Sequence, residues 1–92
     1  MTKQEHNPNN DKELTVVVKT TQGTWTTTFS KTTKVQEVIN AVIEHFGFAK
    51  KGTYELRLEA DPNNPLQNER PLVSYGVKDG DVLIFTDLGI AV

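Results

Sequence analysis

The stretch LVSYGVKDGDVLIF, residues 72–85, decides how the domain closes at its C-terminal end. Its central KDGD is a turn signal, because a glycine between two aspartates favours a tight chain reversal. The VLIF that follows predicts the last strand. Alternation gives that strand two faces, with Leu83 and Phe85 on one and Val82 and Ile84 on the other.

Two β-rich runs near the start of the chain predict a hairpin. LTVVVKTTQ, residues 14–22, is β-branched almost throughout, and Gly23 separates it from TWTTTFS, residues 24–30. Alternation places one set of the second strand on a single face, namely Trp25, Thr27 and Phe29. Three consecutive valines leave the inward set of the first strand open, and we prefer Leu14, Val16 and Val18.

The period changes after the hairpin, where apolar residues recur at steps of three and four and predict an amphipathic helix over residues 34–46. These apolar residues are Val35, Val38, Ile39, Val42, Ile43 and Phe46. Thr33 is the predicted N-cap, with Gln36 at the spacing of a capping box. Gly47 supplies a left-handed stop at the C-terminal end.

The remaining segments complete the predicted order of elements. TYELRLE, residues 53–59, alternates apolar and charged side chains, which is typical of a half-buried strand. The Pro- and Asn-rich stretch over residues 60–71 predicts turns and a short irregular strand around Leu66. Hairpin, helix, strand, loop and strand together predict an α+β fold with one covered and one open sheet face. We expect a flexible leader (1–12), a domain (13–87) and a C-terminal tail (88–92).

Composition narrows the possible partners. With 92 residues, 36% of them hydrophobic, the chain has room for one compact core. The absence of cysteine excludes disulfides, zinc-thiolate sites and a thioester on a cysteine of this chain, although its C-terminal carboxylate could still be joined to the thiol of another protein. The net charge of −2 gives no cationic excess for nucleic acid. No run approaches the roughly 20 apolar residues of a membrane span, and the start lacks a signal sequence. We expect a cytoplasmic monomer that binds neither nucleic acid nor membrane.

Motifs for catalysis or metal binding are missing from the sequence. There is no G-x-S-x-G, P-loop or H-E-x-x-H motif. His6 and His45 lack the spacing of metal ligands. Asp79 and Asp81 flank Gly80 as in a turn, without the other oxygen ligands of a calcium loop. We therefore expect no enzyme, no catalytic residue, no cofactor and no metal site.

Two local motifs and the order of elements resemble ubiquitin and the ubiquitin-like β-grasp domains over residues 14–85. VVKT, residues 17–20, is similar to FVKT of ubiquitin, and LVSYGV, residues 72–77, is similar to its Leu-Ser-Asp-Tyr-Asn-Ile. The resemblance implies one helix on a mixed sheet of four to five strands. It also implies a structural role for Tyr75, whose hydroxyl would hydrogen-bond backbone in the neighbouring loop. The short chain looks like the single-domain ubiquitin-like proteins of bacteria.

This resemblance implies two functions, which the final TDLGIAV separates. A modifier is joined to its target through a C-terminal glycine, and a peptidase that removed Ile90, Ala91 and Val92 would expose Gly89 to activating and conjugating enzymes. However, the family's usual glycine pair is absent, and from Gly89 the reach past Phe85 is short. The alternative is a non-covalent interaction or scaffold module that is never conjugated. A β-grasp sulfur carrier would also need a free glycine pair.

The open face of the sheet is the predicted partner surface. Ubiquitin is read through an apolar patch whose matching positions here are polar, namely Thr21, Arg57 and Thr86. We therefore expect no binding to ubiquitin receptors. Alternation instead turns another set outward, which consists of Val17, Lys19, Arg57, Val82 and Ile84. Contiguous apolar side chains with a charged rim are typical of protein-binding sites, whereas scattered aliphatic side chains are common on any sheet.

Overall fold

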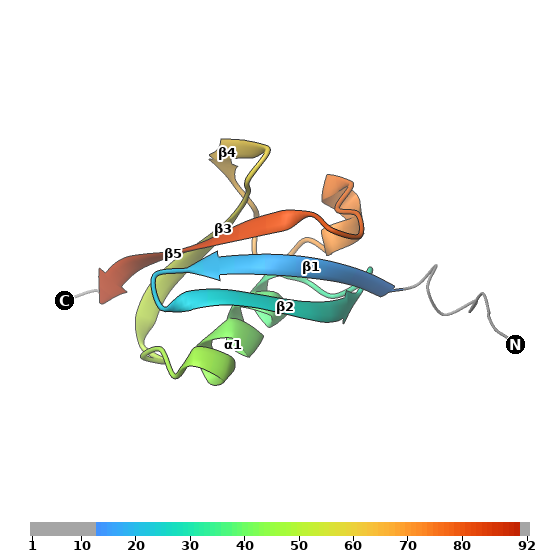
Figure 1. The fold of residues 1–92 in the computed structure, drawn as a ribbon. Coiled ribbons are helices and arrows are strands. Elements are labelled where there is room, and N and C mark those ends of the chain that lie inside the picture. Colours follow the sequence, from blue (N-terminus) through green and yellow to red (C-terminus); the bar gives the residue numbers. More distant parts are fainter. Residues whose placement is uncertain (1–12, 91–92) are drawn as a thin grey trace, which may run out of the picture.

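The computed structural model describes residues 13–90 as one helix packed on a mixed sheet of five strands (Figure 1). In chain order the elements are β1 (Glu13–Thr20), β2 (Gly23–Ser30), α1 (Val35–Phe46), β3 (Gly52–Leu58), β4 (Asp61–Pro65), the 3₁₀ helix η2 (Leu72–Tyr75) and β5 (Val82–Ile90). The predicted α+β arrangement is confirmed. The leader predicted over residues 1–12 lies outside the described residues.

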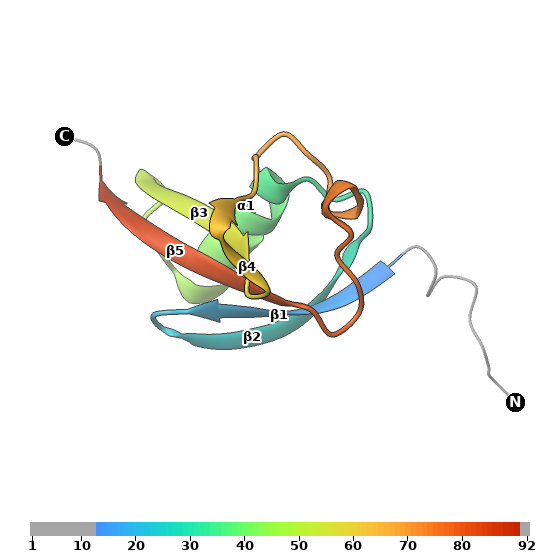
Figure 2. The same cartoon turned by 90° about the horizontal axis from the view of Figure 1, so that it is seen from above.

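The last strand occupies the middle of the sheet, whose order is β2-β1-β5-β3-β4. β5 pairs in parallel with β1 and antiparallel with β3. β1 and β2 form the predicted antiparallel hairpin. Pairing between β1 and β5 covers only Val17 to Lys19 opposite Val82 to Ile84, and both views show β5 running on past the hairpin (Figures 1 and 2). The first and last strands of the domain therefore depend on each other.

The core lies between α1 and one face of the sheet. The preferred inward set of the first strand is correct, because Leu14, Val16 and Val18 are all buried. Every apolar residue of the helical period from Val35 to Ile43 is buried as well. Trp25 and Phe29 of β2 pack half-buried against the edge of this core. The alternation and the helical period thus identify the core-facing residues correctly.

The N-terminus of α1 is capped one residue later than the sequence predicts. Lys34 is the N-cap, and its N–H donates to a carboxylate oxygen of Glu37 at 2.8 Å. The prediction of Thr33 was wrong because the Thr33 carbonyl accepts a hydrogen bond from the Leu72 N–H at 2.9 Å. Thr33 therefore belongs to the contact between the helix entry and η2 rather than to the helix.

A loop distant in sequence completes the start of the helix. The Val35 N–H, which has no acceptor inside the helix, donates to the Arg70 carbonyl at 3.0 Å. At the other end Gly47 adopts φ +76° and donates its N–H to the Ile43 carbonyl at 2.8 Å, as the stop signal predicts. The local sequence was therefore sufficient to predict where α1 ends. It was not sufficient to predict the N-cap, because that end depends on a contact with a distant loop.

Two strands differ from their predicted extents. The irregular strand expected around Leu66 is β4, which ends at Pro65 just before it. Leu66 itself is buried, and its N–H donates to the Leu56 carbonyl at 2.8 Å. The last strand, predicted over residues 82–85, continues to Ile90. Part of the segment assigned to a tail therefore lies in the sheet.

Candidate protein-interaction surface

The structure brings the five predicted surface residues together on three neighbouring strands. Val17 lies beside Val82, and Ile84 lies between Lys19 on β1 and Arg57 on β3. Their neighbours in each strand face the core, so all five side chains lie on the sheet face opposite α1. We call Val17, Val82 and Ile84 the apolar strip.

An ion pair crosses this apolar strip. Its three side chains are half-buried rather than fully exposed. Lys19 Nζ lies 2.6 Å from a Glu59 carboxylate oxygen, and the two side chains are about half exposed, at 51% and 48%. Because Lys19 neighbours Ile84 while the Glu59 N–H donates to the Val82 carbonyl, the pair spans β5 diagonally. The lysine and glutamate chains thus partly cover the aliphatic residues.

Hydrogen bonds to groups of β3 and β4 hold Arg57 on the same face. Its guanidinium donates to one Glu55 carboxylate oxygen from Nη2 at 2.7 Å and from Nε at 3.2 Å. Nη1 donates to the Pro62 carbonyl at 2.9 Å. Both predicted cations of the rim are therefore paired with carboxylates. Glu55 and Glu59 were not predicted for this surface, although alternation along TYELRLE places them on this face.

Tyr75 lies away from the apolar strip and supports a loop. The Gln67 N–H donates to the Tyr75 hydroxyl at 2.8 Å. The Arg70 guanidinium lies over the ring, 5.1 Å from its centre. Arg70 also provides the carbonyl that accepts from the start of α1, so this tyrosine contributes to the contact between loop and helix.

Gly89 lies inside β5, at an irregularity in its pairing with β3. Tyr54 pairs with Asp87 and Gly52 pairs with Ile90, so β5 contains one residue more than the facing stretch of β3. One class of β-bulge places a glycine in the left-handed region. Gly89 has φ +92°, and its N–H donates to Asp87 Oδ1 at 2.8 Å. The left-handed backbone conformation at position 89 therefore favours glycine over any residue with a Cβ.

The side chains considered for chemistry have structural contacts. His45 stacks on Trp25 with ring centres 4.0 Å apart, and His6 lies outside the described residues. Asp79 accepts the Thr15 N–H at 2.7 Å, which ties the KDGD turn to β1. Within residues 13–90, no three histidine or carboxylate side chains gather as metal ligands, and no helix has the length and apolarity to cross a membrane.

Comparisons with known proteins agree with this fold. A family model described as "WXG100 protein secretion system (Wss), protein YukD" matches residues 13–85. A protein designed on the basis of ubiquitin has a similar structure, with a TM-score of 0.72 and 17% identity over 87% of this chain and 94% of that one. The ubiquitin-like domain of an Arabidopsis thaliana protein gives a TM-score of 0.72 and 17% identity, covering 98% of this chain and 95% of that one. No curated protein matches the sequence. The implied ubiquitin-like β-grasp fold is confirmed.

Proposed function

Since the chain belongs to the YukD family of the WXG100 protein secretion system, we propose that it is a ubiquitin-like interaction module that binds a protein of such a system and is not conjugated. This is the second of the two functions that the sequence resemblance implies. The observation that carries it is the position of Gly89 in the bulge of β5.

Conjugation would make a different demand on the same residue. A modifier presents its terminal glycine on an extension that an activating enzyme can reach. Gly89 instead lies between Asp87, which accepts its N–H, and Ile90, which pairs with Gly52. Removal of the residues after Gly89 would leave its carboxylate beside the sheet. These contacts favour the non-covalent module over the modifier.

The proposed contact surface is the apolar strip together with Lys19 and Arg57. A partner that covers the strip must either displace the ion pair between Lys19 and Glu59 or pack around it. Because that pair is about half exposed, breaking it costs about 1 kcal/mol or less. A partner with an apolar centre and a polar rim suits this surface. We place this monomeric module in the cytoplasm of a bacterium, without catalytic residues or cofactors.

The surface is tested by one substitution and a matched control. Co-purification from the native host with a tagged chain would identify the partner, and calorimetry would then give its affinity. We expect Ile84→Asp to weaken binding about tenfold or more, because it places a carboxylate in the apolar strip. Val73→Asp makes a similar apolar-to-acidic change at a half-exposed residue of η2, outside the sheet, and should leave the affinity nearly unchanged. If Ile84→Asp changes no partner's affinity, the proposed surface is wrong.

The choice between module and modifier is tested by intact mass. Denaturing mass spectrometry of the chain from its native host, with the neighbouring genes expressed, should give an uncut Val92 and no heavier adducts. Loss of Ile90 to Val92, or a Gly89 remnant on a lysine of another protein, would establish the modifier function instead.

A further inference from the structure

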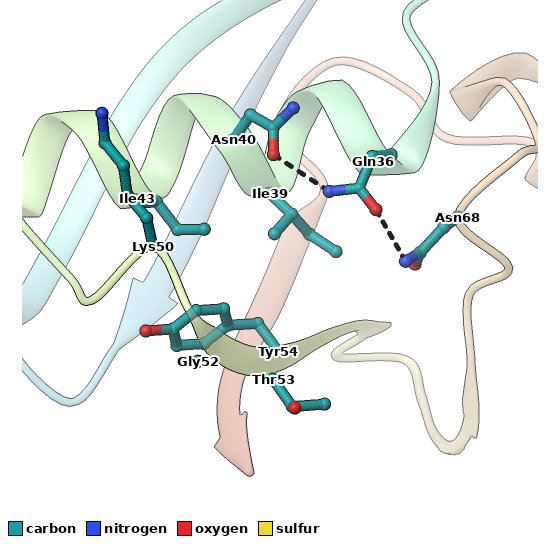
Figure 3. Close-up of a pocket in the computed structure, with 9 residues that line it drawn as sticks. All are labelled: Gln36, Ile39, Asn40, Ile43, Lys50, Gly52, Thr53, Tyr54 and Asn68. Carbon is teal, nitrogen blue, oxygen red and sulfur yellow. Dashed lines mark hydrogen bonds between the residues drawn. The ribbon is translucent and has the colours of Figure 1, made fainter. Parts of the chain in front are cut away.

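A groove separates α1 from the first half of β3, on the side of the sheet away from the apolar strip (Figure 3). Its cavity has a volume of about 220 Å³. The buried side chains Ile39, Ile43 and Tyr54 form its floor. Binding pockets for drug-sized molecules have volumes of roughly 300 to 1,000 Å³, so this groove suits a few side chains of a peptide better.

The β3 side of the groove is an open sheet edge. β4 pairs with only Arg57 and Leu58 of β3. The Leu56 carbonyl accepts the Leu66 N–H, so the backbone groups of Leu56 point away from β5. Backbone groups alternate along a strand, and those of Tyr54 therefore point the same way. Within residues 13–90, no segment pairs with this edge of Tyr54, whose N–H and C=O face the groove side.

The α1 side of the groove carries a row of amide side chains. Asn68 Nδ2 donates to Gln36 Oε1 at 2.9 Å, and Gln36 Nε2 donates to Asn40 Oδ1 at 2.9 Å (Figure 3). All three residues are exposed. Each amide has both a donor and an acceptor, as a peptide group does. The row can therefore hydrogen-bond to the backbone of a chain lying in the groove.

We propose that this groove binds an extended segment of a partner protein, which adds a short strand to the open edge of β3 at Tyr54. The Tyr54 N–H and C=O bond to the segment's backbone, and every second side chain of the segment packs on the apolar floor. The amide row lies on the other side of the segment.

Positive charge at one end of the groove indicates which residues the bound segment carries there. Lys50 lines this end, and its ammonium lies 3.7 Å from a Glu44 carboxylate oxygen. Both side chains are largely exposed, so this pair is weak. Lys51 follows directly and gives this end an excess of positive charge. The bound segment alternates apolar residues and carries an acidic residue at the end that reaches Lys50.

This binding site goes beyond the proposed function, because it uses the opposite face of the sheet from the apolar strip. A partner on one surface does not exclude a partner on the other. Substitutions on the two surfaces consequently separate the two proposals.

The test uses random heptapeptides displayed on phage and selected on the full-length chain, with counter-selection on Asn40→Arg, whose long side chain fills the groove. We expect the recovered peptides to alternate apolar residues and to carry an acidic residue at one end. Nuclear magnetic resonance with one recovered peptide should shift the Tyr54 backbone amide and the side-chain amides of Gln36 and Asn68. Exchange of the Tyr54 N–H with solvent should slow about tenfold or more.

Two controls define the result. Asn63→Arg makes the same change on exposed β4, outside the groove, and should retain binding, as should Ile84→Asp in the apolar strip. Asn40→Arg should lose binding about tenfold or more. The proposal is overturned if no peptide distinguishes the wild type from Asn40→Arg, or if the shifts fall on the apolar strip.

Discussion

Gly89 could be required for either of two reasons. Conjugation needs an accessible terminal glycine, and the bulge of β5 needs a residue in the left-handed conformation. The Gly89 φ of +92° is a conformation that an L-residue with a Cβ adopts only at a cost of about 1 kcal/mol or more. We expect Gly89→Ala to lower the free energy of unfolding by about that amount in urea denaturation. Leu88→Ala, at a half-exposed neighbour, should change it by less than about 0.5 kcal/mol. Equal stability of Gly89→Ala and wild type would mean that the bulge does not require glycine at position 89.

The ionisation of Tyr54, which pairs with the end of β5, affects the stability of the domain at high pH. Burial raises the pKa of the Tyr54 hydroxyl above its usual value of 10.0, and the carboxylate of Asp87 raises it further. The hydroxyl also donates to the Ala49 carbonyl at 2.6 Å. Because the folded pKa is higher than the unfolded one, the stability that this group contributes is complete below about pH 10 and is lost as pH rises toward the folded pKa.

The corresponding experiment compares thermal unfolding of wild type and Tyr54→Phe from about pH 8 to about pH 11. We expect the wild type to lose stability more steeply above pH 10, although Tyr54→Phe is the less stable protein at neutral pH for lack of the bond to Ala49. Parallel curves would show that other groups cause the alkaline loss.

Among the elements, α1 allows a direct test between the N-cap seen in the structure and the N-cap predicted from the sequence. The carboxylate of Glu37 accepts the Lys34 N–H, whereas no hydrogen bond of the Thr33 side chain is present among residues 13–90. We expect Glu37→Ala to reduce the free energy of unfolding by about 1 kcal/mol and Thr33→Ala by less than half of that. Chemical denaturation measures both, and the reverse ranking would restore Thr33 as the cap.

Periodicity in the sequence was enough to predict the elements that bury a regular face. The alternation of Leu14, Val16 and Val18 and the period of α1 depend on neighbours in the chain, so both were predictable. The start of α1 and the length of β5 depend on contacts from elsewhere. The carbonyl of Arg70 and the edge at Gly52 are brought there only by the complete fold.

For the open face of the sheet, too, features set by neighbours in the chain were predictable and features set by distant contacts were not. Alternation identified which side chains share the open face, and the strand order brought them together. The ion pair of Lys19 with Glu59 was not predictable, since it requires β5 to lie between β1 and β3. The groove was missed for a similar reason: an open edge at Tyr54 becomes visible only when β4 is seen to cover no more than Arg57 and Leu58.

For the whole molecule, the central position of β5 predicts how the domain responds to shortening. A chain that ends at Asp81 lacks the strand between β1 and β3 and the buried residues Leu83 and Phe85. We expect this chain to show no cooperative thermal transition by circular dichroism. A chain that ends at Gly89 retains nearly all of β5 and should unfold cooperatively. A folded chain ending at Asp81 would mean that the other strands form a sheet without β5.

The side-by-side position of β1 and β5 also has a consequence for protein synthesis. A ribosome releases β1 first among the strands of this domain, but β5, which pairs with it in parallel, emerges after all the others. Until then the nascent hairpin and helix have no middle strand, and their apolar faces stay exposed to water or to chaperones. This domain can therefore finish folding on the ribosome only after β5 has emerged, so a product that is stalled or terminated before β5 exposes its apolar face and becomes a substrate for proteases.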